Sequence, residues 1–415
     1  MNKMYTNNGR RINVSIDILI LILVSINFFD LTLFASTFDG NGGFVIYMLA
    51  LVFIYIRNVG FQLRSDISPK LKPMWWILAG VLISFIPAYR YYGQPFFYSP
   101  IVYRQFAAYL IYPILLSVRP TNTEIKRALY SFSFIYLVLL LCVSFIAPGW
   151  VVLSEGSDFI EEGDIVHRLP GDQFLVLAFI YAVDDFRNGN NKLKYGIISI
   201  LIFFAVFLLR SRTLLMASLS VILFGALFER RAKRRFATEV IMVIFLVVFL
   251  FVAFTVVSGL YEETMFQLSD TDYNRVKGFK YFISGVNGWL SYIWGNGFIS
   301  GHISPIVDDL HSEGIYYSDL GLVGFWYQFG IIPVLTILIY VFRGLSKNHS
   351  FLIRANALCI LVCGFTISYF LTPRYSLWLC LFFYLFYSDA DYYEAMKQEE
   401  ILKKAKMIRR YRSLI

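Results

Sequence analysis

The chain has 415 residues, of which 58% are hydrophobic and 16% charged, and its mean hydropathy is +0.62. Soluble domains carry about 25% charged residues, so this composition excludes an ordinary soluble enzyme and predicts an integral membrane protein. The formal net charge is +9. We do not predict a nucleic-acid partner, because the basic residues are distributed over short segments between apolar stretches, as in membrane proteins.

A helix needs about 20 residues to cross a bilayer. Apolar stretches that reach this length, with tilt or flanking residues, recur along the whole chain. We predict an all-α fold with about twelve transmembrane helices. The predicted spans are approximately 12–34, 42–57, 74–92, 101–118, 128–147, 171–186, 195–209, 213–228, 237–258, 321–342, 355–371 and 374–388. Arg210-Ser211-Arg212 and Thr372-Pro373 each join two spans, which predicts two tight helical hairpins. No internal repeat or low-complexity segment divides the chain, so residues 1–415 form a single polytopic membrane domain.

The first apolar run starts directly after Arg10-Arg11 and lacks a small-residue cleavage site, so we expect it to remain as a membrane anchor. Lysine and arginine set the orientation, because cytoplasmic loops are enriched in them. With the N-terminus inside, the inner segments hold 28 of the 37 basic residues. These segments are 1–11, 57–73, 119–127, 184–194, 229–236, 343–354 and the basic tail 389–415. We therefore predict that both termini are cytoplasmic and that the loop 259–320, between spans nine and ten, faces outward.

The outward loop 259–320 is the main candidate for chemistry, because a long connection in a compact protein is usually functional. It carries Arg275, a glycine-rich turn at 295–301, and His311 between Asp308-Asp309 and Glu313. A neutral imidazole can accept a hydroxyl proton near pH 7, so His311 is a candidate general base. The alternative is a loop histidine that hydrogen-bonds a neighbouring acid.

Metal and nucleotide sites are not expected. The chain has no His-x-x-x-His or His-Glu-x-x-His pattern, no phosphate-binding loop and no Gly-x-Gly-x-x-Gly that opens a helix. We predict no metal and no cofactor. The four cysteines lie in apolar segments, at Cys142, Cys359, Cys363 and Cys380. We expect them to be packing residues.

Basic residues outside the inner segments form a second candidate group. They are Arg90, Arg104, Arg168, Arg210, Arg212, Arg275, Lys277, Lys280 and Arg374. The planar guanidinium suits two-point binding of phosphate oxygens, so outward arginines near the membrane fit a lipid pyrophosphate. Arg104 falls inside a predicted span, where a charge costs at least about 2.5 kcal/mol. The alternative is that these side chains extend to the interface or pair with outward carboxylates.

Three segments resemble the O-antigen polymerase and ligase superfamily of Wzy-type polymerases and WaaL-type ligases. His167-Arg168-Leu169-Pro170-Gly171-Asp172-Gln173 resembles the family's Arg-x-x-Gly segment before a helix. Leu209-Arg210-Ser211-Arg212-Thr213 resembles its Ser-Arg hairpin. Arg275, Trp294-Gly295-Asn296-Gly297-Phe298, His311-Ser312 and Gly321-Leu322-Val323-Gly324-Phe325 resemble its large outer loop and the glycine-rich helix start that follows. The likeness covers roughly residues 148–342, and Ser312 stands where the family often has Asn.

The resemblance implies a GT-C-like fold in the bacterial plasma (inner) membrane, and an enzyme of polysaccharide or lipopolysaccharide biosynthesis. It implies a metal-independent, inverting glycosyltransferase that acts on the outer face, with an undecaprenyl-pyrophosphate-linked oligosaccharide as donor. His311 would accept the proton of the acceptor hydroxyl, with Arg275 and Arg210 as further catalytic residues. The substrate-binding residues would be Arg168, Arg212, Arg104 and Arg90. Membrane lipid, a chain-length regulator and a flippase would be its partners.

Two other functions stay open at this point. A ligase would move finished polymer onto lipid A core, and it shares the donor, topology and catalytic residues of a polymerase. A lipid-linked oligosaccharide flippase can also have twelve spans, but it would show two similar halves, which this chain lacks. We favour the polymerase. Tyrosines and tryptophans of the outer loop could stack on sugars, or they could form an interfacial belt.

Overall fold

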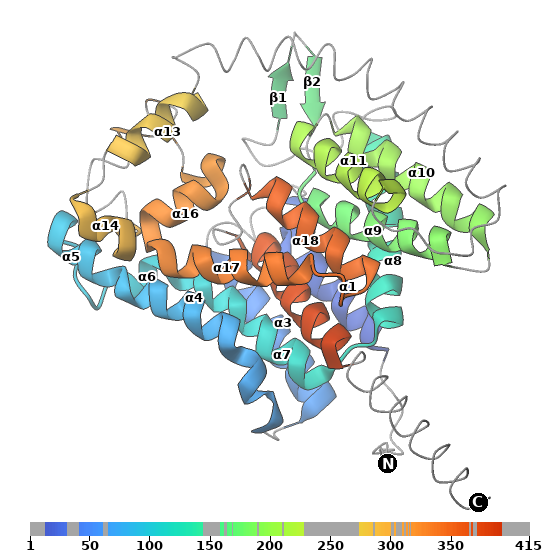
Figure 1. Cartoon of the computed structure of the whole chain (residues 1–415), viewed down its shortest axis with the longest axis horizontal. Helices are drawn as coiled ribbons and strands as arrows, with labels where there is room; N and C mark the ends of the chain where they lie inside the picture. The colour runs from blue at the N-terminus through green and yellow to red at the C-terminus, as the bar shows by residue number, and fades with distance from the viewer. Residues whose placement is uncertain are drawn as a thin grey trace, which may run out of the picture.

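A computed structural model of the chain describes residues 13–30, 41–60, 65–143, 158–161, 164–167, 169–188, 191–209, 211–227, 274–284, 287–299, 303, 309–310, 313, 315, 317–364, 367 and 372–391. Within these ranges the fold is built from helices (Figure 1), which confirms the predicted all-α class. One short hairpin is the exception, and the sequence did not predict it. Strands β1 (Asp158–Glu161) and β2 (Asp164–His167) pair antiparallel in a predicted outer segment.

The first half of the chain contains helices that are often broken into shorter pieces. They are α1 (Val14–Ser25), η1 (Asn27–Asp30), α3 (Asn41–Val59), η2 (Ser65–Leu71), α4 (Lys72–Ile83), α5 (Phe85–Tyr92), α6 (Ser99–Val102), η3 (Arg104–Leu110), α7 (Ile111–Val118) and α8 (Asn122–Leu141). The predicted span 101–118 is thus three pieces, with a 3-10 helix in the middle that begins at Arg104.

The second half follows the predicted spans closely at its start. Its helices are α9 (Asp172–Asn188), α10 (Lys192–Leu208), α11 (Arg212–Leu227), α13 (Asn274–Ser284), α14 (Trp289–Trp294), η5 (Tyr317–Leu320), α16 (Gly321–Phe329), α17 (Ile331–Gly344), α18 (Phe351–Cys363) and helical residues 373–391. The hairpin expected around Arg210-Ser211-Arg212 is confirmed, because α10 ends at Leu208 and α11 begins at Arg212. The predicted span 237–258 lies outside the described residues.

Two expectations about helix boundaries were wrong. The predicted span 321–342 is divided at Gly330, whose φ of +77° is compatible with glycine and not with a continuous helix. The predicted span 355–371 ends early, because α18 stops at Cys363 and Gly364 caps it. Most of the residues between Gly364 and Thr372, next to the predicted turn at Thr372-Pro373, lie outside the described residues, and helical residues resume at 373.

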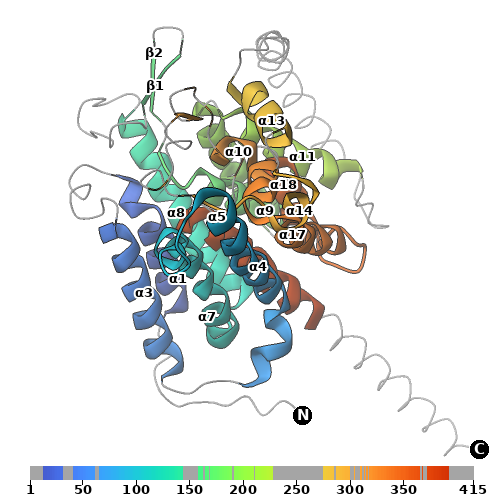
Figure 2. The ribbon, with the colours of Figure 1, turned by 90° about the vertical axis from the view of Figure 1, so that its left-hand side faces the viewer.

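The helices pack into one assembly. α9 packs along α10 and also contacts α8, α11 and α18, which places it in the middle of the bundle (Figure 2). α4 lies alongside α17, and α1 lies between α3 and α8. A single large core runs through these helices, and ten consecutive residues of α9, 173–182, are all buried. A second, smaller core lies among α13, η5 and α16, away from the bundle.

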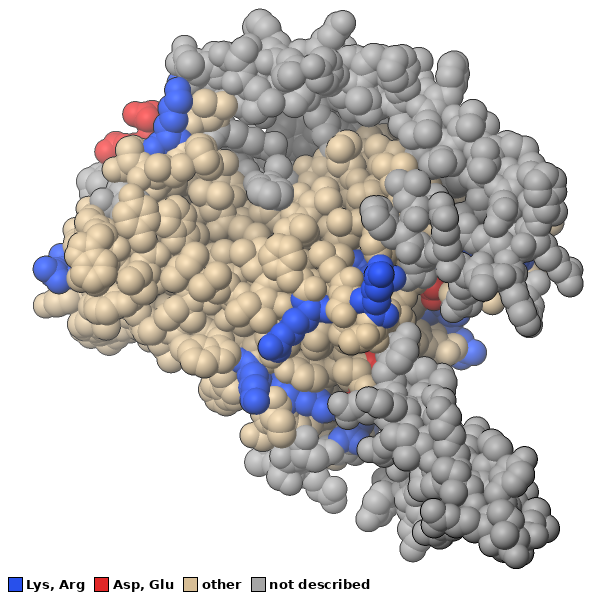
Figure 3. Space-filling model, viewed as in Figure 1, with Lys and Arg blue, Asp and Glu red and all other residues tan. Residues whose placement is uncertain are grey.

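The exterior of the bundle is apolar. Within the part of the chain that the structure describes, two helical segments are long and apolar enough to cross a membrane, Gly42–Val59 and Ile67–Tyr92. The outer face of α3 presents Leu49 and Phe53 with 63% and 59% of their surface exposed, and α10 and α17 present similar residues. Figure 3 shows a wide uncharged surface, with most of the visible Lys and Arg in its lower part and others at its left and upper-left edges. Apolar patches of this extent mark contact with lipid or another protein.

Candidate functional site

The segment before α9 is held in place by α8. The hydroxyl of Tyr136 donates a 2.5 Å hydrogen bond to the carbonyl of Leu169, and Leu169 is buried. Gly171 follows with a φ of +101°, and a Cβ at this position would lie 2.9 Å from the ring of Phe132. Only glycine fits there without a shift of its neighbours. Gly171, the glycine of the Arg-x-x-Gly segment, therefore forms a tight turn that packs against α8 directly before α9.

A group of polar side chains surrounds the first turn of α9. Asp172 and Arg374 both lie near enough to the phenols of Tyr136 and Tyr375 to interact with them electrostatically. Arg374, at the start of helical residues 373–391, also hydrogen-bonds Tyr375 and lies over its ring at 5.0 Å. Charged groups at a buried helix end need partners, and this arrangement supplies them.

Gln173 extends this polar group into the bundle. Its side chain is completely buried, and neither its Nε2 nor its Oε1 has a hydrogen-bond partner among the residues that the structure describes. An unsatisfied buried amide costs about 1–3 kcal/mol for each lost partner. Its place beside Asp172 makes Gln173 a candidate for binding a polar group at the start of α9.

The glycine-rich turn after α14 packs closely against two other parts of the chain. A Cβ on Gly297 would lie 2.6 Å from Cβ of Ala88 on α5. The amide of Asn296 donates to the carbonyl of Tyr327 at 2.7 Å, and the amide of Gly297 donates to the carbonyl of Gln328 at 2.9 Å. The Gly-x-Gly turn thereby joins α5, α14 and the end of α16. Glycine is required in this turn because three backbone segments approach one another closely there.

A cluster of aromatic side chains fills the small outer core. Phe282 of α13 stacks on Tyr317 with ring centroids 5.0 Å apart, and its ring lies 4.8 Å from that of Tyr327 on α16. Tyr281 lies 6.4 Å from Tyr327 and hydrogen-bonds it. We call Tyr281, Phe282, Tyr317 and Tyr327 the outer aromatic cluster. Aromatic pairs of this geometry add about 0.5–1.5 kcal/mol each beyond buried area, so the cluster fixes α13 on α16.

The outer aromatic cluster also holds the described neighbours of His311. Leu310 and Ile315 are buried in the same small core, and the amide of Ile315 donates to the carbonyl of Leu310 at 2.8 Å. The side of α13 that carries Gly278 packs on Ile315 and Leu320. Arg275 belongs to the first turn of this same helix. Leu310, Ile315 and the helix of Arg275 are thus parts of one packed unit.

Burial affects the ionisation of this unit. It raises the pKa of Tyr317 well above 10.0, and the phenols of Tyr92 and Tyr281 raise it further. Burial also raises the pKa of Tyr281, and a hydrogen bond with Tyr327 acts in the opposite direction. Both phenols therefore stay protonated at neutral pH and act as neutral hydrogen-bond donors.

The outer unit is joined to the α9 region through α16 and α18. The amide of Leu322 in the first turn of α16 donates to the carbonyl of Gly364 at 2.7 Å. Cys363, one residue earlier, lies close enough to Asp172 for the two to interact electrostatically. The start of α16 therefore lies against the end of α18, and α18 in turn packs on α9.

The predicted site residues divide into three groups. Arg90 and Arg104 have described side chains, and both are exposed. Arg90, in the last turn of α5, lies 6.0 Å from the ring of Tyr91 and beside Trp294 of α14. Arg104 donates at 3.3 Å to the carbonyl of Ile101, and the structure does not bring it into contact with Arg90. Arg104 thus lies on the surface and is not enclosed in a site.

The remaining predicted residues have no described side chain. Arg212 and Arg275 lie in the first turns of α11 and α13, where the backbone is described. The residues Arg168, Arg210 and His311 lie outside the described residues. Their roles stay predictions.

Sequence reasoning missed the polar group of Asp172, Gln173 and Arg374 as a unit, although it singled out Arg374. It also missed Tyr281 and Tyr317 as members of a common core. Asp172 and Gln173 follow the Arg-x-x-Gly motif directly, so their place in that motif was the available signal. The contact of Arg374 with residues near 172 had no signal in a single sequence.

Three cysteines are buried and Cys142 is half-buried, all with free thiols, as expected for packing residues. Among the described residues no group of three or more histidine, cysteine or carboxylate side chains is placed to hold a metal ion. No protein-family model matches the chain, and a search of curated proteins finds no match.

Proposed function

We propose that this protein is an O-antigen or polysaccharide polymerase, a glycosyltransferase that acts on the outer face of the bacterial plasma membrane. The observation that supports it best is the packing of α13 with the segment around His311. The outer aromatic cluster joins the helix of Arg275 to Leu310 and Ile315, the described neighbours of the proposed base. A cation and a base carried by one packed unit would suit a transfer to a sugar hydroxyl, and this is the arrangement we propose for Arg275 and His311.

In the proposed reaction the donor is an undecaprenyl-pyrophosphate-linked glycan and the acceptor is a second lipid-linked repeat unit. The acceptor hydroxyl oxygen attacks the anomeric carbon of the donor with inversion, and the bond from that carbon to the pyrophosphate oxygen breaks. A ring nitrogen of His311 takes the hydroxyl proton. Undecaprenyl pyrophosphate leaves, and arginines neutralise the charge that develops on it. This reaction needs no metal and no cofactor.

The positions of the arginines at helix starts favour an anionic ligand. The N-terminal end of a helix carries a partial positive charge, so a cation there is disfavoured by about 0.3–1 kcal/mol. Arg212, Arg275 and Arg374 nevertheless lie in the first turns of their helices. A pyrophosphate would reverse this penalty, because it interacts favourably with both the guanidinium and the helix end. The polar group of Asp172 and Gln173 lies in the same region as Arg374.

The proposed topology has about twelve transmembrane helices, a GT-C-like arrangement and both termini in the cytoplasm. Its support is the apolar exterior of α3, α10 and α17 and the two helical segments long enough to span a bilayer. The predicted inner segments 57–73 and 119–127 also meet residues 388–391 around one cavity, as the topology requires. A chain-length regulator and a flippase are proposed partners.

The test uses the purified protein in liposomes with one lipid-linked repeat unit and no other acceptor. A ladder of lengthening lipid-linked glycans is expected for a polymerase. Product that forms only after lipid A core is added would identify a ligase. Substrate that crosses the bilayer without forming any covalent product would identify a flippase and overturn the assignment to an enzyme.

A further inference from the structure

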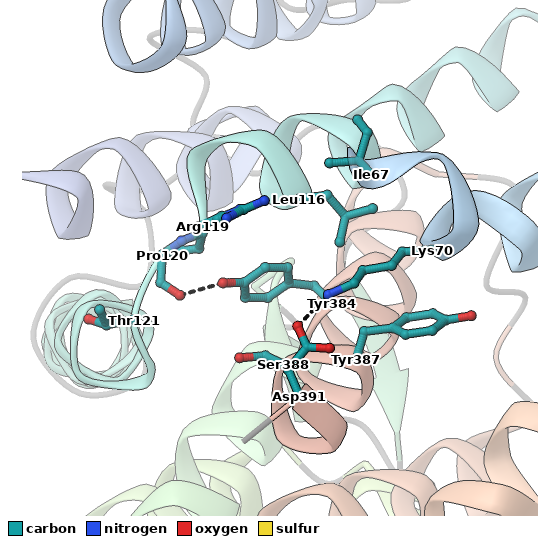
Figure 4. Close-up of a pocket in the computed structure, with 10 residues that line it drawn as sticks. All are labelled: Ile67, Lys70, Leu116, Arg119, Pro120, Thr121, Tyr384, Tyr387, Ser388 and Asp391. Carbon is teal, nitrogen blue, oxygen red and sulfur yellow. Dashed lines mark hydrogen bonds and ion pairs between the residues drawn. The ribbon is translucent and has the colours of Figure 1, made fainter. Parts of the chain in front are cut away.

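A cavity of about 480 Å³ opens where segments that the sequence predicts to be cytoplasmic come together (Figure 4). The predicted outer loop belongs to the other side of the membrane in the predicted topology. Three segments that are far apart in the chain surround the cavity. Ile67 and Lys70 come from η2, Leu116 and Arg119 from the end of α7, and Tyr384 to Asp391 from the last helix. The volume is within the range of ligand sites, about 300–1,000 Å³. This cavity has no part in the proposed transfer reaction.

The walls of the cavity are rigid. The hydroxyl of Tyr384 donates to the carbonyl of Pro120 at 2.6 Å, and the hydroxyl of Tyr112 donates to the carbonyl of Lys70 at 2.7 Å. Thr121 and Glu124 form reciprocal hydrogen bonds that cap α8. These bonds fix the backbone on both sides of Arg119 and Lys70. A preformed site of this kind binds without a large ordering penalty.

Two cations and one carboxylate set the charge of the cavity. Lys70 reaches across it and forms an ion pair with Asp391 (Figure 4). Asp391 has 60% of its side chain exposed and Lys70 30%, so the pair lies at the mouth. Exposed ion pairs contribute little to stability, about 0–1 kcal/mol. An anion that enters can therefore replace Asp391 as the partner of Lys70, and Arg119 lines the same cavity.

The surroundings place this mouth at the depth of lipid head groups. Trp75 and Trp76 follow Lys70 by less than two helical turns, and each has 58% of its surface exposed. Exposed tryptophans beside lysines are typical of the membrane–water interface. The adjacent face of α3 is apolar and exposed. A lipid could thus lay its chains on the apolar exterior while its head group enters the cavity.

We propose that this cavity binds the phosphate-bearing head group of an anionic membrane phospholipid, with Lys70 and Arg119 as its cationic partners and Asp391 as the competing carboxylate. Ser388 lines the same space and supplies a hydroxyl group for a polar head group. The inference requires the membrane placement but not the transfer reaction, so the two proposals fail independently.

The test measures lipid binding to the full-length protein in detergent, by native mass spectrometry with phosphatidylglycerol and phosphatidylcholine as probes. The unsubstituted protein is expected to retain phosphatidylglycerol in preference to phosphatidylcholine. Lys70→Gln and Arg119→Gln are each expected to weaken phosphatidylglycerol binding by about tenfold, the usual effect of losing a charged hydrogen bond. Asp391→Asn is expected to strengthen it, because the competing carboxylate is removed.

Lys72→Gln is the matched control, since Lys72 is an exposed neighbour that does not line the cavity. Equal loss in Lys72→Gln and Lys70→Gln would show a general surface charge effect and overturn the proposal. Weaker binding in Asp391→Asn would indicate a ligand with its own cation and would also overturn it. Inorganic phosphate that displaces the lipid at a lower concentration than phosphatidylglycerol itself would identify a soluble phosphate ligand instead of a lipid.

Discussion

Tyr136 on α8 and Leu169 before α9 are joined by a 2.5 Å hydrogen bond between the phenol and the backbone carbonyl. This bond positions the segment that follows the predicted pyrophosphate ligand Arg168. Tyr136 also lies within electrostatic range of Asp172 and Arg374. The geometry of the proposed binding region therefore depends on a residue that no sequence motif singled out.

Tyr136→Phe is expected to destabilise the protein by about 1–3 kcal/mol, because the buried carbonyl of Leu169 loses its partner. Glycosyl transfer is expected to fall as well, since the segment next to Arg168 loses its anchor. Tyr130→Phe is the matched control, because Tyr130 also lies on α8 and donates to Asp185 of α9 at 3.0 Å. Unfolding in detergent and the liposome assay compare the two. Equal loss of transfer in both variants would contradict a specific role for Tyr136.

Gly330→Ala is expected to prevent correct packing of α14 on α16 and α17. Gly330 has a φ of +77°, and a Cβ there would overlap the carbonyl of Ile293. Gly60→Ala is the control, because Gly60 has a similar φ of +74° but open space around it. The control isolates the backbone strain, about 1–2 kcal/mol. The difference in melting temperature between the two variants measures the overlap, and equal melting temperatures would contradict the tight crossing.

The sequence was sufficient for the helices that are uninterrupted. The predicted spans 171–186, 195–209 and 213–228 agree with α9, α10 and α11 to within a few residues, because a continuous apolar run in a membrane chain has no other way to satisfy its backbone. Hydropathy does not detect breaks inside such a run. The break at Gly330 depends on the carbonyl of Ile293, which only the folded chain brings close.

The candidate site was less predictable than the helices. Single residues such as Arg374 stood out because a charge in an apolar segment is costly. Their partners did not, because Arg374 and Asp172 are about 200 residues apart in the chain, and only folding brings both within electrostatic range of Tyr375. The same applies to Phe282 and Tyr327 in the outer aromatic cluster. Patterns in the sequence identified candidate residues. Contacts in the folded chain determine which of the described candidates lie together.

Substitutions that remove charge at Arg210 or Arg212 are expected to weaken binding of undecaprenyl pyrophosphate to the purified protein. Arg212→Lys keeps the charge but loses the planar fork, so it is expected to bind with intermediate affinity. Arg212→Gln is expected to bind least. Calorimetry or a spin-label binding assay gives the affinities. Unchanged affinity in both charge-removing single variants would indicate that these arginines only anchor the hairpin at the interface.

The stability of the outer aromatic cluster is expected to fall at alkaline pH. Burial raises the pKa of Tyr317 in the folded chain above the 10.0 of the unfolded chain, so above pH 10.0 the unfolded chain loses its proton first. The contribution is therefore complete below pH 10.0 and decreases as pH rises further. The Tyr317→Phe variant lacks the ionisable phenol. Its free energy of unfolding should therefore depend less steeply on pH above 10.0 than that of the unsubstituted protein. The same slope in both proteins would contradict burial of the phenol.

His311→Ala is expected to abolish glycosyl transfer and leave expression and membrane insertion unchanged. The neighbouring Leu310 and Ile315 are packed in the small outer core, which is expected to hold this segment without the imidazole. His349→Gln is the control, because His349 forms a hydrogen-bonded pair with Asp389 at 3.0 Å in a predicted inner segment. It is expected to retain transfer. General base catalysis contributes typically about 10²–10⁴-fold to the rate, so the liposome assay has enough range to detect the loss. Full activity of His311→Ala would remove the assignment of His311 as base, while the arginine predictions would remain to be tested on their own.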